Sequence, residues 1–304
     1  MSTESTGTDV SVHADEPIVR VRHPWRWVAV VVIALYVAEG ISFAATNDAL
    51  RWDLVGGYLF EASILRGLWM TVKLTVVAML VGLVLGTVLA VMRLSDNPVL
   101  RAVASGYVWL FRGTPILVQL LFWFFLGTVL PQIGLGVPFG PDLVSGETSE
   151  VITPFMAAIL GLGLNEAAYM AEIVRAGIGS VDKGQTEAAE ALGMSPVTTY
   201  RRVVLPQAAR LIVPPAANQT ISMLKLTSLV LVIGLAELTT TAQLIYGRNF
   251  QQIPLLIVAS IWYLTLTTVL TIVQGRLERR LGRSDATGRR QTRRLDETMK
   301  GARA

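Results

Sequence analysis

Six long apolar runs limit the folds open to this sequence. They cover residues 27–45, 74–92, 113–139, 152–174, 211–236 and 253–273. A helix needs about 20 mostly apolar residues to cross the hydrocarbon core of a bilayer, and each run meets or nearly meets this length. The third run exceeds one simple span, and we expect its helix to end near Leu130, since Pro131 and further Gly and Pro residues follow. The runs predict an all-α, polytopic bundle of six transmembrane helices.

The composition agrees with a membrane protein and excludes several kinds of catalytic site. Hydrophobic residues make up 52% of the chain and charged residues only 16%, against about 25% in ordinary soluble domains. The chain has no cysteine, and its two histidines, His13 and His23, precede the first apolar run. Disulfides, thiolate metal sites and Ser-His triads in the bundle are therefore excluded. We expect no catalytic residue, no metal site and no enzyme activity in this chain.

Basic residues predict how the helices are oriented. Residues 20–26, the loop 93–101, residues 175–210 and the segment 276–304 all carry Lys or Arg, whereas residues 127–154 contain none. Cytoplasmic loops of membrane proteins are enriched in Lys and Arg. With six spans every basic segment falls on one side, so we expect a multi-pass protein of the cell membrane with both termini in the cytoplasm.

Residues 183–206, between the fourth and fifth apolar runs, predict a bent pair of short helices. Gly193 suits the positive φ at which helices commonly end, while Ser195 can cap a second helix and Pro196 fits its first position. Pro206 is expected to break the chain before the next span. The outline also matches a DNA-binding helix-turn-helix, but a short tether beside the bilayer would keep it from a major groove, and we expect no nucleic-acid partner.

The same segment carries a recognisable signature. Glu187-Ala188-Ala189, three residues, Gly193, nine residues, Val203, one residue and Leu205-Pro206 resemble the EAA signature of importer-type ABC transporter permeases. In that family this loop forms coupling helices that dock into a groove of the ATPase subunit. The resemblance implies that Glu187, Ala188, Ala189, Gly193, Leu205 and Pro206 couple the chain to an ATPase.

Further blocks resemble the subfamily of type I importers that take up polar amino acids. They are residues 111–115 (FRGTP) with Gln119, residues 168–175 (AYMAEIVR), residues 225–229 (KLTSL), residues 236–238 (AEL) and residues 276–280 (RLERR). Ala168 stands where the subfamily more often has Gly.

The resemblance divides the chain into four parts. Residues 62–281 form the permease domain, and residues 25–46 are an extra N-terminal transmembrane helix outside the minimal family pattern. Residues 1–24 and 282–304 are expected to be disordered cytoplasmic tails. The second tail is basic, and we favour contact with anionic membrane lipid over nucleic acid.

The resemblance also implies partners. No GxxxxGK[ST] motif occurs in the chain, so it cannot bind ATP by that motif, and ATP and Mg²⁺ are expected on separate ATPase subunits, two per complex. A soluble extracytoplasmic binding protein would deliver the solute. A second permease, either a copy of this chain or a relative, would complete a dimer.

Polar residues inside spans are candidates for the solute pathway, because each is costly in lipid. Glu166, after Asn165, either pairs with a solute amino group or bonds to a neighbouring helix. Lys225, with Thr227 and Ser228 just beyond it, either holds a solute carboxylate at a broken helix or reaches the membrane surface or Glu237.

Five further polar or proline positions complete the candidate list. Tyr169 and Gln119 either line the route or pack in the core. Arg112, Thr114 and Pro115 form either an inner gate or the start of a helix.

These features predict the permease subunit of an ATP-driven importer for polar amino acids. A permease for another small zwitterion, such as a compatible solute, is the first alternative. An ion-coupled secondary transporter is the second, although the chain shows no repeated halves around its intramembrane charges.

Overall fold

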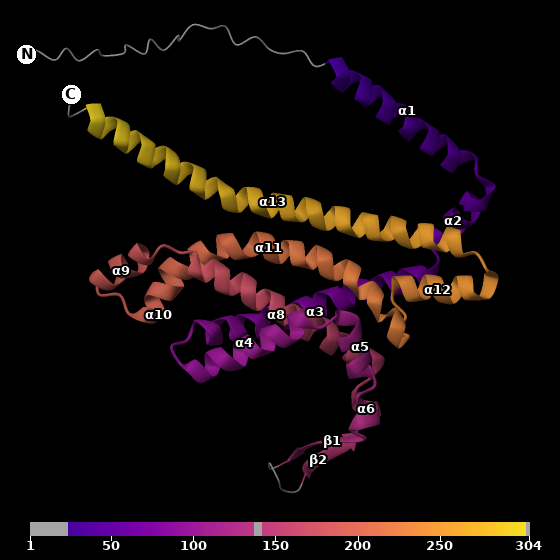
Figure 1. Ribbon diagram of the computed structural model, residues 1–304, viewed down its shortest axis with the longest axis horizontal. Helices are drawn as coiled ribbons and strands as arrows, with labels where there is room; N and C mark the ends of the chain where they lie inside the picture. Colours follow the sequence, from indigo (N-terminus) through magenta and orange to yellow (C-terminus); the bar gives the residue numbers. More distant parts are fainter. Residues whose placement is uncertain (1–23, 137–141, 302–304) are drawn as a thin grey trace, which may run out of the picture. The chain divides into compact units, whose positions relative to one another are not determined.

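The computed structural model describes the backbone of residues 24–136 and 142–301, and nearly all of it is helical (Figure 1). The chain divides into two compact units that meet between Leu50 and Arg51. Residues 1–23 of the predicted N-terminal tail lie outside the described residues, and Pro24, its last residue, begins the first helix.

The first unit contains α1 (Pro24–Thr46) and a short 3-10 turn (Asp48–Leu50). Residues 25–46 of α1 are long and apolar enough to span a membrane. The large apolar side chains of α1 are exposed on all of its faces, as expected of a helix surrounded by lipid.

The second unit is built on the close packing of α3 (Ala62–Leu94) and α8 (Pro154–Gly179), which follow α2 (Trp52–Leu59). Small residues let the two backbones approach. Gly82 lies against Glu166, and Gly86 lies against Met170, so the helices run in the same direction. Such contacts between small residues are the usual means by which helices associate in membranes.

The predicted third span is wrong in its geometry. The chain forms α4 (Pro98–Gly113) and α5 (Ile116–Phe124), which meet at a bend of 101°. Pro115 caps α5 and has no amide proton, and the extended backbone at Thr114 and Pro115 separates the helices. Hydropathy did not reveal the bend, because apolar side chains continue on both sides of it.

A β-hairpin occupies much of the connection between α5 and α8, which the sequence left without regular structure. After the short α6 (Leu126–Val129), β1 (Gln132–Gly136) pairs antiparallel with β2 (Asp142–Glu147), and α7 (Thr148–Val151) follows. The Thr148 hydroxyl donates to the Leu130 carbonyl, and the Thr148 amide donates to the Pro131 carbonyl (3.0 Å). These bonds close the base of the hairpin.

The bent pair predicted for residues 183–206 forms α9 (Lys183–Ala191) and α10 (Pro196–Thr199), but its end differs from the expectation. Pro206 does not break the chain. A π-helical turn (Tyr200–Val204) joins α10 to α11 (Leu205–Leu226), and Pro206 lies in the first turn of α11. The wide turn accommodates the missing proline donor without ending the helix.

After Leu226 the chain forms a 3-10 helix (Thr227–Ile233) that ends at Gly234, where φ is 71°. The next helix is α12 (Leu238–Asn249). Glu237 precedes α12 and is completely buried. Its carboxylate accepts hydrogen bonds from Thr71 of α3, from the amide and hydroxyl of Thr240, and from the Tyr263 hydroxyl. A buried carboxylate therefore ties three helices together.

The last helix, α13 (Gln252–Gly301), continues well past its span. Its backbone is helical through Gly301, and the division between a permease domain and a basic tail at residue 282 stays a prediction.

Within the described residues, five helices can each cross a membrane, and six spans result when α4 and α5 count as one. The all-α bundle predicted from the sequence is therefore confirmed, with its third span broken.

Candidate functional site

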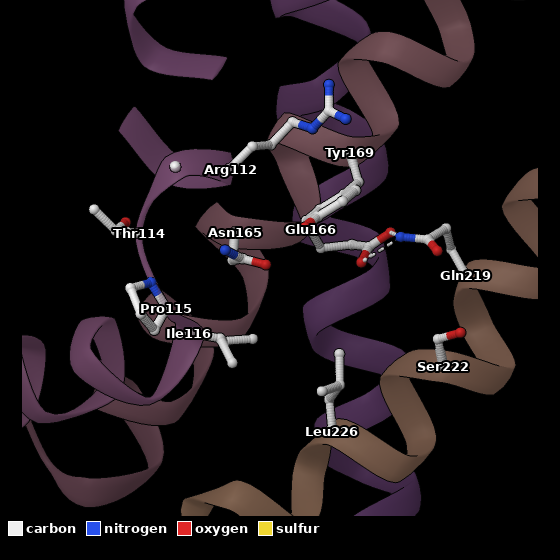
Figure 2. Close-up of a pocket in the computed structure, with 11 residues that line it drawn as sticks. Arg112, Thr114, Pro115, Ile116, Asn165, Glu166, Tyr169, Gln219, Ser222 and Leu226 are labelled. Atoms are coloured by element: carbon white, nitrogen blue, oxygen red, sulfur yellow. Dashed lines mark hydrogen bonds between the residues drawn. The ribbon is translucent and has the colours of Figure 1, made fainter. Parts of the chain in front are cut away.

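A cavity of about 500 Å³ lies where the bend between α4 and α5 faces α8 and α11 (Figure 2). This volume falls in the range of small-molecule sites. Its lining residues are Arg112, Gly113, Thr114, Pro115, Ile116, Asn165, Glu166, Tyr169, Gln219, Ser222 and Leu226. Six of the predicted pathway or gate residues thus come together in one place: Arg112, Thr114, Pro115, Asn165, Glu166 and Tyr169.

Glu166 supplies the carboxylate of this cavity. Its side chain is only 2% exposed, and Gln219 of α11 donates to both of its oxygens at 3.4 Å. The four ion pairs between described residues do not include Glu166. Glu166 is thus bonded to a neighbouring helix through a neutral partner, and none of the ion pairs among the described residues gives it a cationic one.

Asn165 and Gln119 form hydrogen bonds that stabilise the bend between α4 and α5. The Asn165 side-chain amide donates to the Phe111 carbonyl (2.8 Å) and to Gln119 Oε1 (3.2 Å). Gln119 Nε2 lies within donating distance of the Phe111 carbonyl (2.9 Å) and of the carbonyl and hydroxyl of Thr114 (3.2 and 2.8 Å). Gln119 is buried behind the cavity wall rather than in it. The pair satisfies backbone carbonyls that the bend leaves without helical donors.

Arg112 and Tyr169 lie at one end of the cavity. The Arg112 guanidinium lies over the Tyr169 ring, 5.3 Å from its centroid, in cation–π geometry. The side chain of Arg112 is 44% exposed, and it also reaches Glu172, one turn further along α8, at 3.4 Å.

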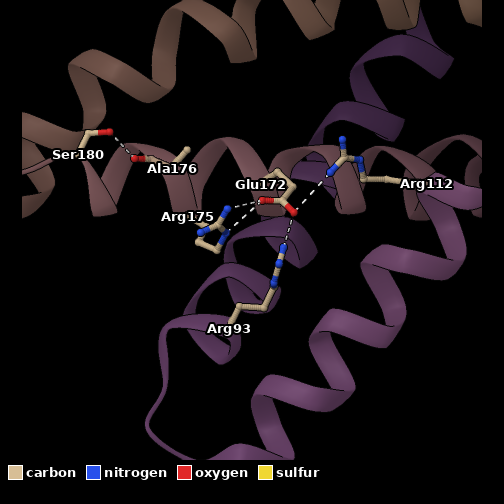
Figure 3. Close-up of polar contacts among 6 residues, drawn as sticks. All are labelled: Arg93, Arg112, Glu172, Arg175, Ala176 and Ser180. Atoms are coloured by element: carbon tan, nitrogen blue, oxygen red, sulfur yellow. Dashed lines mark hydrogen bonds and ion pairs between the residues drawn. The ribbon is translucent and has the colours of Figure 1, made fainter.

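Glu172 gathers three arginines next to the cavity (Figure 3). Arg93 at the end of α3 and Arg175 of α8 bind it at 2.5 and 2.9 Å, and Arg112 of α4 is its third and most distant partner. The cluster joins α3, α4 and α8 and carries two positive charges in excess of its single carboxylate.

The structure places the remaining predicted pathway residues outside the cavity. Lys225 is exposed, and none of the ion pairs of the described residues joins it to Glu237. Thr227 is buried and donates to the Leu224 carbonyl, while Ser228 donates to the Lys225 carbonyl. The sequence missed Gln219 and Ser222, although two polar residues three positions apart within a span could have indicated one polar face of α11.

The segment of α9, α10 and the π-helical turn, together with the first turn of α11, presents the residues predicted to couple to an ATPase. Glu187, Ala188, Gly193, Leu205 and Pro206 are exposed, and Ala189 is buried. The amides of Gly193 and Met194 return to carbonyls of α9, and Gly193 has φ of 73°. This is the glycine-terminated helix end expected from the sequence. Leu192 and Val197, which the prediction did not name, are 82% and 77% exposed beside it.

The described residues contain no group of three or more His, Cys, Asp or Glu side chains arranged to hold a metal ion. The chemistry available in the cavity is accordingly that of one carboxylate, one guanidinium, amides and hydroxyls. Such a set can bind a small zwitterionic or cationic solute.

Known proteins resemble this chain over most of its length. The arginine transport system permease protein of Corynebacterium glutamicum is 46% identical over 92% of this chain and 88% of its own length. The L-cystine transport system permease protein of Bacillus subtilis is 39% identical over 78% of this chain and 94% of its own. A crystal structure of an amino acid ABC transporter with histidines superposes with a TM-score of 0.60, at 37% identity, over 72% of this chain and 94% of that chain.

The family of inner membrane components of binding-protein-dependent transport systems matches residues 82–283, a range that contains both the cavity and the α9–α10 segment. The chain is therefore a multi-pass membrane protein that works with an ABC ATPase and a solute-binding protein, and it belongs to the family of binding-protein-dependent transport system inner membrane components.

Proposed function

We propose that this chain is the permease subunit of an ATP-driven importer for amino acids, and that the Glu166 cavity binds the solute during its passage. The observation that carries the proposal is a buried carboxyl group without a cationic partner, which lines a cavity beside the bend between α4 and α5. Buried charges in membranes are costly and mark solute pathways.

The solute we infer is a cationic amino acid, with arginine as the first candidate. Glu166 offers a negative charge to an ammonium or guanidinium group, and Gln219 and Ser222 offer neutral polar contacts. A relative that matches nearly the whole chain is named for arginine transport, which supports this choice. A compatible solute with a quaternary ammonium group would gain the charge interaction but no hydrogen bond from it.

We further propose that both termini and the α9–α10 segment face the cytoplasm. Arg93 in the last turn of α3 and Arg101 in the first turn of α4 flank the α3–α4 connection, and the basic residues of 175–210 begin near the end of α8, which runs in the same direction as α3. By the positive-inside rule we assign the β-hairpin, which lies within residues 127–154, a segment without Lys or Arg, to the outer side.

In the complete importer, two ATPase subunits carry ATP and Mg²⁺, and a second permease, either a copy or a relative, completes the pathway. The exposed Leu192 and Val197 beside Gly193 form an apolar tip suited to an ATPase groove. Closure of the ATPases on ATP draws the two α9–α10 segments together, and the spans open outward. Hydrolysis restores the inward state.

The test is uptake of radiolabelled L-arginine into vesicles that contain this permease and the ATPase that copurifies with it, with the solute-binding protein present on the outer side. We expect uptake that needs ATP and persists when ionophores remove ion gradients. Competition by a compatible solute instead of amino acids would favour the first alternative, and uptake that collapses with the ion gradient would favour a secondary transporter. Gly193→Arg, placed in the α9–α10 segment, should abolish uptake while membrane insertion is retained.

A further inference from the structure

Arg112 lines three cavities beside α8. Besides the 500 Å³ Glu166 cavity, it borders a groove of about 650 Å³ between α8 and α11 and a smaller one of about 430 Å³ beside α4. The larger groove, which we call the inner groove, is also lined by Glu172, Ile173, Ala176, Gly177, Ser180, Leu211 and Pro215.

The cavity and the inner groove are two sections of one passage. On α11 their lining residues are Leu211, Pro215, Gln219, Ser222 and Leu226, spaced four, four, three and four positions apart. This spacing keeps all five on one face of a helix. The face of α8 opposite them continues in the same way from Asn165 and Tyr169 to Ala176 and Ser180.

The inner groove leads from the cavity toward the α9–α10 segment. It follows α8 to Ser180, and α9 begins at Lys183. Between the two sections, the passage is bordered by Arg112, which is the one lining residue that both share. A solute that leaves the Glu166 cavity by this route must pass the Arg112 guanidinium.

The bonds of Arg112 suit a group that can change partners. Its contact to Glu172 at 3.4 Å is the longest of the three ion pairs there, and its side chain is 44% exposed. When Arg112 leaves, Glu172 keeps Arg93 and Arg175, so no carboxylate is left unpaired. A second carboxylate can then take the place of Glu172 at Arg112, in the two-bond geometry that guanidinium groups favour.

We propose that Arg112 is a specificity-determining residue that binds the α-carboxylate of the solute at the junction of the Glu166 cavity and the inner groove. It exchanges Glu172 for the solute carboxylate as the solute passes. This inference rests on the proposed function, because it takes the solute to be an amino acid. Glu166 binds the cationic end of the same molecule, so each of the two charged residues recognises one end of the solute.

The experiment compares L-arginine with agmatine, which is arginine without its carboxylate, in ATP-driven uptake into vesicles. The wild-type permease should prefer arginine strongly. Arg112→Gln should raise the KM for arginine about 10- to 100-fold, which is the loss of affinity expected when one charge-assisted hydrogen bond is removed. Agmatine uptake should stay nearly unchanged. The ratio of kcat/KM for the two compounds then falls by the same factor.

Arg175→Gln is the matched control, because Arg175 binds the same Glu172 carboxylate but lines none of the three cavities. It should keep the wild-type ratio even if it lowers the amount of folded protein. Arg112→Lys keeps the positive charge but loses the paired N–H donors of the guanidinium group. Its ratio of kcat/KM for arginine and agmatine should fall between those of the wild type and Arg112→Gln.

The outcomes separate this inference from the proposed function. If the wild-type permease takes up no amino acid, the proposed function is wrong. If it takes up arginine and Arg112→Gln keeps the wild-type ratio, the carboxylate role of Arg112 is overturned. If Arg112→Gln fails to insert, Arg112→Lys decides: an unchanged ratio overturns the role, and a lowered ratio supports it.

Discussion

Gly82 of α3 lies directly against the side chain of Glu166 of α8. A Cβ atom at position 82 would come within 2.5 Å of Glu166 Cγ and 2.8 Å of its Cβ. Contacts this short are not tolerated, so the Glu166 carboxyl group can take its position only because residue 82 of α3 is a glycine.

Gly82→Ala should therefore displace Glu166 and weaken solute binding. We expect a loss of about 1–3 kcal/mol of stability from overpacking, and a raised KM for uptake. Gly106→Ala on α4 is the control, since a Cβ there meets nothing within 4 Å. Alanine is the better helix former, so this control should be neutral or slightly stabilising. Thermal unfolding in detergent and uptake kinetics measure both effects, and equal behaviour of the two variants would contradict the contact.

Gln119→Leu should destabilise the bend between α4 and α5. Gln119 of α5 donates to the backbone carbonyls of Phe111 in α4 and Thr114 in the bend, and it accepts from Asn165. A leucine of similar size leaves buried polar groups without partners, at about 1–3 kcal/mol. The midpoint of thermal unfolding should fall clearly. Thr114→Val removes only one hydroxyl from the same network and should cost less, and the reverse order would show that the network does not hold the bend.

Gly193→Val should impair coupling more than Gly193→Asn. The backbone at Gly193 has φ of 73°, which asparagine tolerates and a β-branched residue does not. We expect the valine variant to insert normally and to lose most ATP-driven uptake, while asparagine retains much of it. Gly179→Ala, at an open position of α8, serves as the control. Similar uptake for valine and asparagine would mean that the shape of this turn is unimportant.

Leu192→Asp and Val197→Asp should prevent association with the ATPase. Both side chains are mostly exposed, so a charge there costs the isolated permease little. On association, the aspartate charge would be buried without a partner in the apolar groove of the ATPase, which is strongly unfavourable. Copurification with the ATPase measures the effect, with Leu192→Met as the control. Undiminished copurification of both aspartate variants would exclude this tip from the interface.

The sequence predicted local features better than long-range ones. The turn at Gly193 and the helix start at Ser195 and Pro196 follow rules that involve a few neighbouring residues, and the structure contains both. The π-helical turn before Pro206 was missed, because the sequence shows where a helical donor is absent but not how the chain adapts.

The cavity could be predicted only in part. Both Glu166 and Lys225 were candidates because a charged residue within a span is costly. Glu166 is buried against α3 and α11, whereas Lys225 is exposed. Which face of a helix turns inward depends on its neighbours, and apolar spans carry little periodic signal. The partners of Glu166, Gly82 and Gln219, lie 84 and 53 positions away, and no local pattern connects them.

The hydrogen bonds of Glu237 also restrict where the protein can deform. Its carboxylate takes donors from α3, α12 and α13, all in a completely buried place. Pulling any of these helices away would leave buried polar groups without hydrogen-bond partners, at a cost of about 1–3 kcal/mol for each group. The three helices should thus behave as a fixed frame, and displacement should concentrate in α11, whose backbone ladder is interrupted at Pro214 and Pro215.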